Sequence, residues 1–246
     1  IFQATALTVT ATASSQVSVT ALSATQSLAT WYNAGGFLAT CTLNISGTTI
    51  TAGAVLTTGE ALHNTCRTKV MAMSATQALV VYTALTTTYL RAMTLNVSGT
   101  TVTAGAALAV SSLATGWLDL TMMSATQAIV AYPGTSGYGE ARTLNISGTT
   151  VTAGAACVAL ASAAVPGSVT ALSSTQAVAS YGSSNIIIYH YLLTVSGTTI
   201  TAGASPAITA GGNYILAAAK VSSTQAIVFS ADSTVYTPRF VLLEIS

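Results

Sequence analysis

Apolar and polar residues alternate along short stretches of this chain, and segments rich in glycine, serine and threonine separate those stretches. In residues 143–155, "TLNISGTTVTAGA", apolar side chains occupy every second position of "TLNIS" and again of "TVTAG". An alternation with a period of two is typical of a half-buried β-strand. Gly148, between the two stretches, supplies the positive φ that a tight hairpin turn requires. The segment therefore predicts a β-hairpin.

This hairpin belongs to a repeat that covers the whole chain. The motif SATQ or SSTQ occurs five times, at intervals of 49 to 51 residues, and its last residue is Gln26, Gln77, Gln127, Gln176 or Gln225. The turn motif SGTT occurs four times, beginning at Ser46, Ser98, Ser147 and Ser196. The third repeat predicts strands at residues 117–124, 128–132, 140–147 and 149–155. Four short strands in a repeat of roughly 40 to 50 residues are the signature of a β-propeller blade.

The fifth copy of the hairpin is divided between the two ends of the chain. The tail "VLLEIS" at 241–246 matches "CTLNIS" at 41–46, and the head "IFQATAL" at 1–7 matches "VTAGAAL" at 102–108. We therefore predict an all-β fold in a single domain, residues 1–246, namely a five-bladed β-propeller with four antiparallel strands in each blade. The N-terminal strand, residues 1–6, completes the C-terminal blade and closes the ring. The expected repeat units are 7–54, 55–106, 107–155, 156–204, and 205–246 together with 1–6.

The composition adds one feature to this picture, because charged residues are scarce. They make up 4% of the chain, against roughly 25% in an ordinary domain. The net charge is +1, 51% of the residues are hydrophobic and the mean hydropathy is +0.67. The longest weakly polar run, residues 153–165, is shorter than the roughly 18 residues of a membrane-spanning helix, so we expect no membrane insertion. Six Lys and Arg residues without a cluster argue against binding to nucleic acid.

A net charge near zero also bears on where the protein works. Such a surface promotes association and suits an assembly outside the cell better than a crowded cytoplasm. We therefore expect an extracellular location or a place on a virion surface. The sequence begins at Ile1 without a signal-peptide pattern, so we expect either that a leader was removed or that the residues belong to a longer chain.

The loops between second and third strands, and the connections between blades, differ from repeat to repeat, whereas the SATQ and SGTT turns barely change. Strand direction places all these variable segments on one face, and a rigid scaffold with variable loops is the usual arrangement for recognition. Aromatic rings with a few polar groups suit stacking on sugars or protein surfaces. The candidate ligand-binding residues are Trp31, Tyr89, Arg91, Trp117, Tyr138, Arg142, Tyr189, Tyr191 and Tyr236. The alternative is that the rings pack between blades, with their tips at the solvent.

The five motif glutamines allow two interpretations. They form a ring of amides that binds a ligand, or each satisfies backbone groups near its own turn. We favour the structural role, because a residue repeated in every blade serves the blade itself. Asn44, Asn96 and Asn145 each begin an Asn-x-Ser pattern for N-glycosylation, and a polar residue at a strand edge explains the same position.

The chain shows no arrangement typical of catalysis or of a metal site. Its five acidic residues are far apart in sequence, and His63 and His190 belong to different repeats without a metal-ligand spacing. Neither a G-x-S-x-G motif nor a P-loop occurs. Cys41, Cys66 and Cys157 form no disulfide framework and are expected to serve as small buried apolar residues. We therefore expect no enzymatic activity, no metal and no cofactor.

Repeats of the form "SATQALVVY…TLNVSGTTVTAGA", residues 74–82 and 94–106, resemble the tandem propeller blades of tailed-phage and marine-bacterial surface proteins. The resemblance covers the whole chain and implies a virion or cell-surface component such as a fibre, a decoration or a receptor-binding head. We therefore expect a non-catalytic structural protein, bound to other subunits of its assembly, with a variable-loop face suited to adhesion. The alternative is a lectin-like module that binds a cell-surface glycan or receptor as a monomer. Small five-bladed lectins resemble this chain in blade number alone, because their Trp-Asp-type blade signature is missing from this chain.

Overall fold

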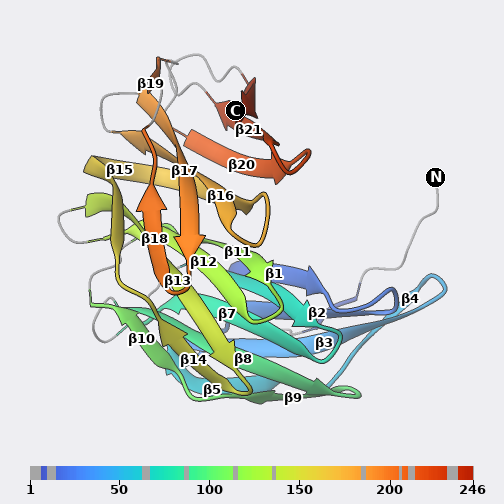
Figure 1. The fold of residues 1–246 in the computed structure, drawn as a ribbon. Helices are drawn as coiled ribbons and strands as arrows, with labels where there is room; N and C mark the ends of the chain where they lie inside the picture. The colour runs from blue at the N-terminus through green and yellow to red at the C-terminus, as the bar shows by residue number, and fades with distance from the viewer. Residues whose placement is uncertain are drawn as a thin grey trace. The chain divides into compact units, whose positions relative to one another are not determined.

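The computed structural model describes residues 7–9, 15–62, 67–85, 89–112, 116–134, 137–183, 187–204, 207–209, 214–231 and 238–245 (Figure 1). The named elements in these ranges are all β-strands, and each pairs with its neighbours in antiparallel fashion. The prediction of an all-β fold built from antiparallel strands is confirmed. Its physical basis is the alternation of apolar and polar side chains, which gives each strand one face to bury.

Within the described residues the strands form sheets of five, five, nine and three strands. The nine-stranded sheet is continuous only through the long strand β15, which pairs with β13 and with β16, so we describe its two halves as sheets 3 and 4 and number five sheets in chain order. Sheet 1 contains β1 (Ser15–Ala21), β2 (Gln26–Tyr32), β3 (Phe37–Ser46), β4 (Thr49–Ala52) and β5 (Leu56–Ala61). Sheet 2 contains β6 (Thr68–Ser74), β7 (Gln77–Thr83), β8 (Leu90–Ser98), β9 (Thr101–Ala104) and β10 (Leu108–Ser111). Sheet 3 contains β11 (Asp119–Ser124), β12 (Gln127–Pro133), β13 (Tyr138–Ser147), β14 (Thr150–Ala153) and the first part of β15 (Cys157–Ala171). Sheet 4 contains the rest of β15, β16 (Gln176–Ser183), β17 (Ile187–Ser196), β18 (Thr199–Ala202) and β19 (Ala207–Thr209). Sheet 5 contains β20 (Tyr214–Lys220), β21 (Gln225–Ala231) and β22 (Pro238–Glu244).

The repeat motifs set the same register in each sheet. A motif glutamine opens the second strand and lies opposite the residue two positions before the end of the third strand, as in the pairs Gln26–Asn44 and Gln77–Asn96. In the third repeat the strands begin and end within two residues of the predicted bounds. Trp117, predicted to open a strand, lies before β11. The periodic pattern is therefore a reliable guide to the inner strands.

The outer edge of sheets 1 to 4 is longer than the sequence indicated. After each TAGA segment the chain returns to the same edge of its sheet and pairs with the N-terminal half of the third strand. The returning strands are β5, β10, the first part of β15 and β19. The expected boundaries after residues 54, 106, 155 and 204 therefore fall inside sheets. A Cβ added at Gly53 of the first TAGA segment would lie 2.3 Å from Thr100 O of the next sheet. Gly53 lies in the gap between β4 and β5, where the pairing with β3 is interrupted. In the sequence this gap looks like the end of the last strand of the repeat unit.

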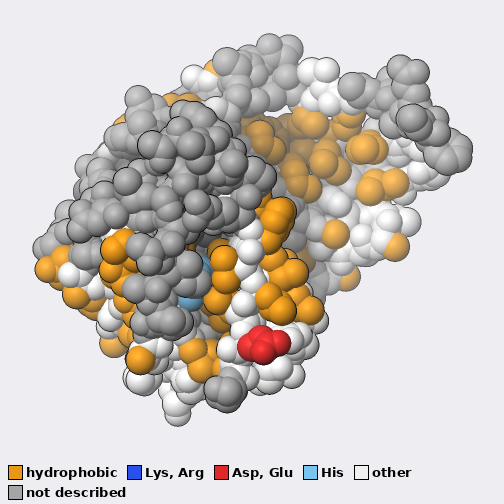
Figure 2. Space-filling model, turned by 90° about the horizontal axis from the view of Figure 1, so that it is seen from above, with side chains coloured by type: hydrophobic (Ala, Val, Ile, Leu, Met, Phe, Trp, Pro, Cys, Tyr) orange, Lys and Arg blue, Asp and Glu red, His pale blue; other side chains and the backbone are white. Residues whose placement is uncertain are grey.

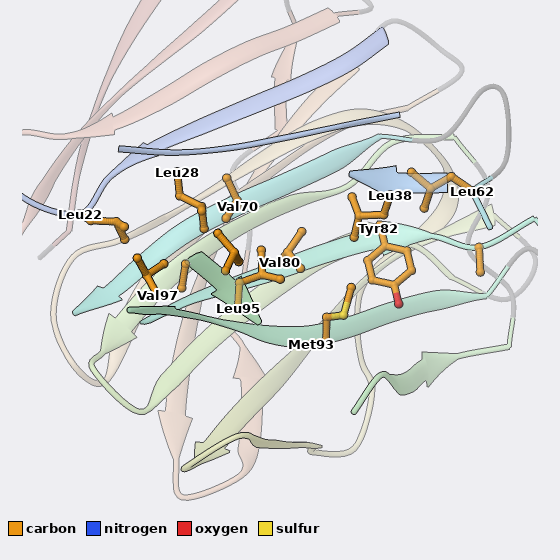
Figure 3. Close-up of a cluster of buried hydrophobic side chains, with 13 residues drawn as sticks. Leu22, Leu28, Leu38, Leu62, Val70, Val80, Tyr82, Met93, Leu95 and Val97 are labelled. Carbon is orange, nitrogen blue, oxygen red and sulfur yellow. The ribbon is translucent and has the colours of Figure 1, made fainter. Parts of the chain in front are cut away.

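The chain forms two compact units, Ile1–Ser112 with Ser147–Val151, and Leu113–Ile146 with Thr152–Ser246. In the first unit, Leu28, Val80 and Leu95 belong to one buried cluster between sheets 1 and 2 (Figure 3). In the second unit, Ile129 and Ala179 belong to a cluster formed by sheets 3 and 4. Each core is thus made where the apolar faces of neighbouring sheets meet, and this packing fixes the loops at the strand ends.

Closure of a ring by the N-terminal strand stays a prediction. Residues 1–6, which the sequence assigns to the last blade, lie outside the described residues. Sheet 5 has three described strands, in the order β20-β21-β22.

Candidate functional site

The motif glutamines of the first three sheets bind the protein's own groups. Gln26 Nε2 donates hydrogen bonds to Asn44 Oδ1 of its own sheet and to Gly99 O in the turn of the next sheet, both at 2.8 Å. Gln77 and Gln127 make the equivalent two bonds, at 2.7 to 2.8 Å. These amides are therefore engaged in joining each sheet to the following turn. The hydrogen bonds describe a structural role and leave no ring of free amides here.

The last two motif glutamines have different surroundings. Gln225 Nε2 donates a hydrogen bond to Glu244 Oε1 at 2.8 Å, because glutamate stands where the first three sheets have asparagine. Gln176 lies opposite Thr194. Its backbone carbonyl accepts hydrogen bonds from Leu172 N and Ser173 N, whereas its side-chain amide has no partner among the described residues. The repeat therefore changes at its C-terminal end.

The asparagines of the Asn-x-Ser patterns are partners of these glutamines. Asn145 Oδ1 accepts the hydrogen bond from Gln127, and Asn145 Nδ2, the atom that a glycan would occupy, is buried without a partner. Asn44 Nδ2 faces Thr42 Oγ1 and Thr51 O, each at 3.4 Å. The folded chain thus uses these side chains inside the sheets, which argues against glycan attachment at Asn145.

Several predicted binding rings are packed inside the units. Trp31 is 5% exposed and Trp117 is 6% exposed. The rings of Trp117 and Tyr181 lie 5.7 Å apart, and Tyr191 meets Tyr181 edge-on at 6.2 Å. The alternative given by the sequence, in which the rings pack between blades, describes Trp117, whereas Tyr191 contacts Tyr181 within sheet 4. The physical reason is that an alternating pattern identifies two faces of a strand but not which of them another sheet covers.

The two predicted arginines are also engaged within the protein. Arg91 forms an ion pair with Glu60 of the preceding sheet. Arg142 Nε donates a hydrogen bond to Tyr132 Oη at 2.8 Å, and Tyr132 Oη donates to the buried Glu140 Oε2 at 2.9 Å. Burial raises the pKa of Tyr132 to about 12, with Arg142 acting against this shift and Glu140 adding to it.

The remaining candidates differ in exposure. Tyr89 is half-buried just before β8, Tyr189 is half-buried in β17, and Tyr138 is 37% exposed at the start of β13. Tyr236 lies outside the described residues. Of the described candidates, Trp117 and Tyr191 are brought together through Tyr181.

Two of the nine line pockets, Trp31 in the first unit and Tyr191 in the second. The Trp31 pocket has a volume of about 330 Å³ and lies beside the loop between β2 and β3. Its lining residues are Val9, Trp31, Asn33, Ala34, Gly35, Ala39, Val55 and Thr57. The indole also packs against Ala39 and Val9, which hold it in place as the apolar wall. None of the lining residues carries a charge, so the pocket suits a neutral ligand.

The loop sequence explains how the polar side of the pocket is formed. Asn33 Oδ1 accepts hydrogen bonds from Gly35 N and Phe37 N, both at 3.0 Å, and Asn33 O accepts one from Gly36 N at 2.9 Å. Gly36 has a φ of +83°, a conformation that glycine adopts without a steric penalty. Asn33 Nδ2 has no hydrogen-bond partner among the described residues, so it remains a donor at the edge of the pocket.

Sequence reasoning missed Asn33, Val55 and Thr57 in this pocket. The loop "NAGGF" carries a signal that could have indicated Asn33, since an asparagine two residues before a glycine often caps its own turn. Val55 and Thr57 follow the TAGA segment, where the predicted repeat unit ended. They reach the pocket because the outer edge of sheet 1 resumes there as β5.

The other titratable groups form no second chemical site. His190 is buried with its Nδ1 2.8 Å from Ser180 Oγ, and burial lowers its pKa from 6.5 to about 4. Cys41 and Cys157 are free thiols whose pKa burial raises, and Cys66 lies outside the described residues. Across the described part of the chain, no group of three or more His, Cys, Asp or Glu residues could hold a metal ion. Nor do the described ranges contain a helix long and apolar enough to cross a membrane.

Comparison with solved structures identifies the fold as a β-propeller. An Aleuria aurantia lectin variant in complex with Fucalpha1-6GlcNAc matches with a TM-score of 0.57 and 16% identity, over 93% of this chain and 78% of the lectin. An AofleA variant from Arthrobotrys oligospora matches with a TM-score of 0.62 and 12% identity, over 94% and 68%. SapL1 lectin in complex with alpha methyl fucoside matches with a TM-score of 0.59 and 12% identity, over 93% and 79%.

These neighbours support a propeller but not the phage and marine-bacterial repeats that the sequence resembles. The Aleuria aurantia lectin is described as a six-bladed propeller, whereas the described residues of this chain form five sheets. A prolyl endopeptidase also matches, with a TM-score of 0.58, but over only 32% of its own chain. No protein-family model matches the sequence, and no curated protein matches it. At these identities the comparisons show the fold alone.

Proposed function

We propose that this protein is a non-catalytic, lectin-like propeller that binds a neutral sugar of an extracellular glycan in the Trp31 pocket. The observation that carries the proposal is the combination of an indole wall, a free amide donor at Asn33 and the hydroxyl of Thr57 in one uncharged pocket. Protein sites for small ligands are usually apolar with a few placed polar groups, and their volumes lie in the range of roughly 300–1,000 Å³.

The neighbours favour this function over the virion or fibre role expected from the repeats. The solved neighbours include lectins in complex with fucosylated ligands, and their names give no support to a structural role in a virion. Sugar rings carry apolar C–H faces and peripheral hydroxyl groups. An indole edge beside amide and hydroxyl groups therefore matches their chemistry. A glycan on a cell surface would be the partner, with the protein outside the cell.

The first experiment measures binding of alpha methyl fucoside and a panel of neutral sugars by calorimetry. Asn33→Asp keeps the oxygen that accepts from Gly35 N and Phe37 N but removes the Nδ2 donor. We expect it to weaken binding roughly three- to tenfold, the usual worth of one hydrogen bond, with the melting temperature unchanged.

A second variant blocks the pocket. Val55→Trp places a large ring in the opening, because Val55 lines the pocket and is 46% exposed. We expect no measurable binding. Val158→Trp is the matched control, since Val158 is 48% exposed and lines no part of this pocket. If the wild type binds a sugar and both Val55→Trp and Asn33→Asp bind it equally well, the site lies elsewhere. If no neutral sugar binds the wild type, the proposal is overturned.

A further inference from the structure

The side-chain amide of Asn33 can donate hydrogen bonds to a ligand in the Trp31 pocket but has no capacity left to accept them. Its oxygen already accepts from Gly35 N and Phe37 N, both at 3.0 Å. These bonds identify which end of the amide is the oxygen, and they use both of its lone pairs. The N–H groups of Asn33 Nδ2 have no partner in the described part of the chain, so they are the polar groups that this side chain offers.

The indole of Trp31 is a second donor in the lining. Trp31 Nε1 makes no hydrogen bond within the described ranges, and it is not sealed off from solvent as the unpartnered Trp117 Nε1 is. An indole N–H only donates. The third polar side chain of the lining, Thr57, is exposed, and its hydroxyl group both donates and accepts.

Acceptors are therefore scarce among the side chains of this pocket. Its described lining contains no Asp or Glu, and the Thr57 hydroxyl is the one side-chain acceptor that remains. A sugar ring that carries only hydroxyl groups brings several donors, and each donor that leaves water without finding an acceptor costs free energy. A carbonyl oxygen only accepts, so it satisfies the donors of the lining without that cost.

The absence of charge in the lining decides which kind of carbonyl group fits. A carboxylate also accepts hydrogen bonds, but no Lys, Arg or His stands among the described lining residues to pair with it. Moving an unpaired charge out of water costs far more than moving a neutral carbonyl group. The pocket therefore favours an amide carbonyl over the carboxylate of an acidic sugar.

The apolar wall of the pocket suits a methyl group. Val9, Ala39 and Val55 line the pocket together with the indole of Trp31. Ala39 is fully buried in the cluster that holds the indole, and Val55 is 46% exposed. A methyl group against this wall is stabilised in proportion to the apolar area that it removes from water. The lining thus matches a ligand with one carbonyl acceptor, one methyl group and few donors.

We infer that the Trp31 pocket recognises the acetamido group of an N-acetylated sugar. The carbonyl oxygen accepts from Asn33 Nδ2, the amide N–H donates to the Thr57 hydroxyl, and the methyl group lies against the apolar wall. The inference rests on the proposed sugar binding and names the chemical group by which the pocket selects its sugar.

The test compares N-acetylated sugars with their parent sugars by calorimetry. N-acetylglucosamine and N-acetylgalactosamine are measured against glucose and galactose, with glucosamine and glucuronic acid as the charged analogues. We expect each N-acetylated sugar to bind at least about tenfold more tightly than its parent, as one hydrogen bond and one buried methyl group would give. The two charged analogues should bind no better than glucose.

Asn33→Asp tests the contact with the carbonyl group. The variant keeps the oxygen that organises the loop and replaces the Nδ2 donor by a second oxygen. The advantage of the N-acetylated sugar should fall from about tenfold to less than about threefold. Val158→Asp introduces the same charge at a residue that is 48% exposed and lines no part of this pocket, so it should keep the full advantage. Circular dichroism melts show whether both variants are folded.

A measurement on the wild type keeps the test decisive if Asn33→Asp does not fold. Saturation-transfer difference NMR with N-acetylglucosamine should give its strongest signal at the acetyl methyl protons, because they lie against the wall. Equal affinity for N-acetylated and parent sugars, or a methyl signal weaker than that of the ring protons, overturns this inference and leaves sugar binding in place. If no neutral sugar binds, alpha methyl fucoside included, the proposed function itself is wrong.

Discussion

Single residues in this chain take their roles from their position in the repeat. The residue five positions after each motif glutamine shows this. In sheets 1 to 4 it is aromatic and almost fully buried, and the residues are Trp31, Tyr82, Tyr132 and Tyr181. The sequence indicates that this position recurs, but not that it is buried. Asn33 is the opposite case, because it belongs to a loop that differs from repeat to repeat, and its Oδ1 organises that loop beside the Trp31 pocket.

His190 illustrates a residue whose environment sets a pH dependence. Its pKa is about 4 in the folded chain, lowered by burial from 6.5. Between these values the unfolded chain binds more protons, so stability is fully present above about pH 6.5 and is lost as the pH falls toward 4. The loss at about pH 4.5 is expected to be roughly 2–3 kcal/mol.

Urea unfolding at about pH 7 and about pH 4.5 measures this loss against His190→Gln, a neutral side chain that can still bond Ser180. Carboxylates titrate in the same interval in both proteins, so the difference between them isolates the histidine. An equal loss of stability in both proteins would show that protonation of His190 contributes nothing.

At the scale of the element, the β-hairpin is the unit that the sequence predicts best. Its alternation, its glycine turn and its register follow from nearby residues, and the strands of the third repeat lie within two residues of their predicted bounds. The continuation of the outer edge as β5 and β10 was missed, because it depends on a contact between Gly53 and a turn 47 residues later. Local patterns do not report such contacts.

The side-chain hydrogen bonds of the motif glutamines predict a difference between two equivalent positions. Gln127→Ala removes the hydrogen bonds to Asn145 Oδ1 and Gly197 O, and we expect it to lower the free energy of unfolding by about 1–3 kcal/mol. Gln176→Ala changes the same position of the SSTQ turn in sheet 4, where no described partner exists. In dilute monomeric protein it should cost less than about 0.5 kcal/mol.

Thermal and urea unfolding of both variants test this difference. The comparison is internal, because the two glutamines occupy the same position of the turn and differ in their side-chain hydrogen bonds. A cost at Gln176 as large as that at Gln127 would mean that the turn itself, and not the bonds to Asn145 and Gly197, sets the energy.

At the scale of the molecule, the repeat was enough to predict a propeller but not its relatives or its ligand. The five glutamine motifs predict five sheets, and the described residues form five when the nine-stranded sheet is divided at the shared strand β15. The similar lectins have little sequence in common with this chain, 12% to 16%, because a propeller blade requires only alternation and turns. The pocket beside Trp31 arises where a loop, a broken edge strand and Val9 meet, and no single motif encodes that meeting.

The scarcity of charge gives the last prediction, which concerns how copies of the chain associate. Charged side chains are sparse on the face drawn in Figure 2, where apolar ones are spread widely. With 4% charged residues and a net charge of +1, contacts between copies are expected to be mainly apolar. Raising NaCl from about 0.05 M to about 1 M shortens the screening length from more than 10 Å to about 3 Å and would weaken a contact made by charges. We expect the mass measured by light scattering to stay constant or to rise over this range, and to rise further in sulfate, which strengthens apolar contacts. Dissociation in salt would mean that the few charged groups, and not apolar side chains, hold the copies together.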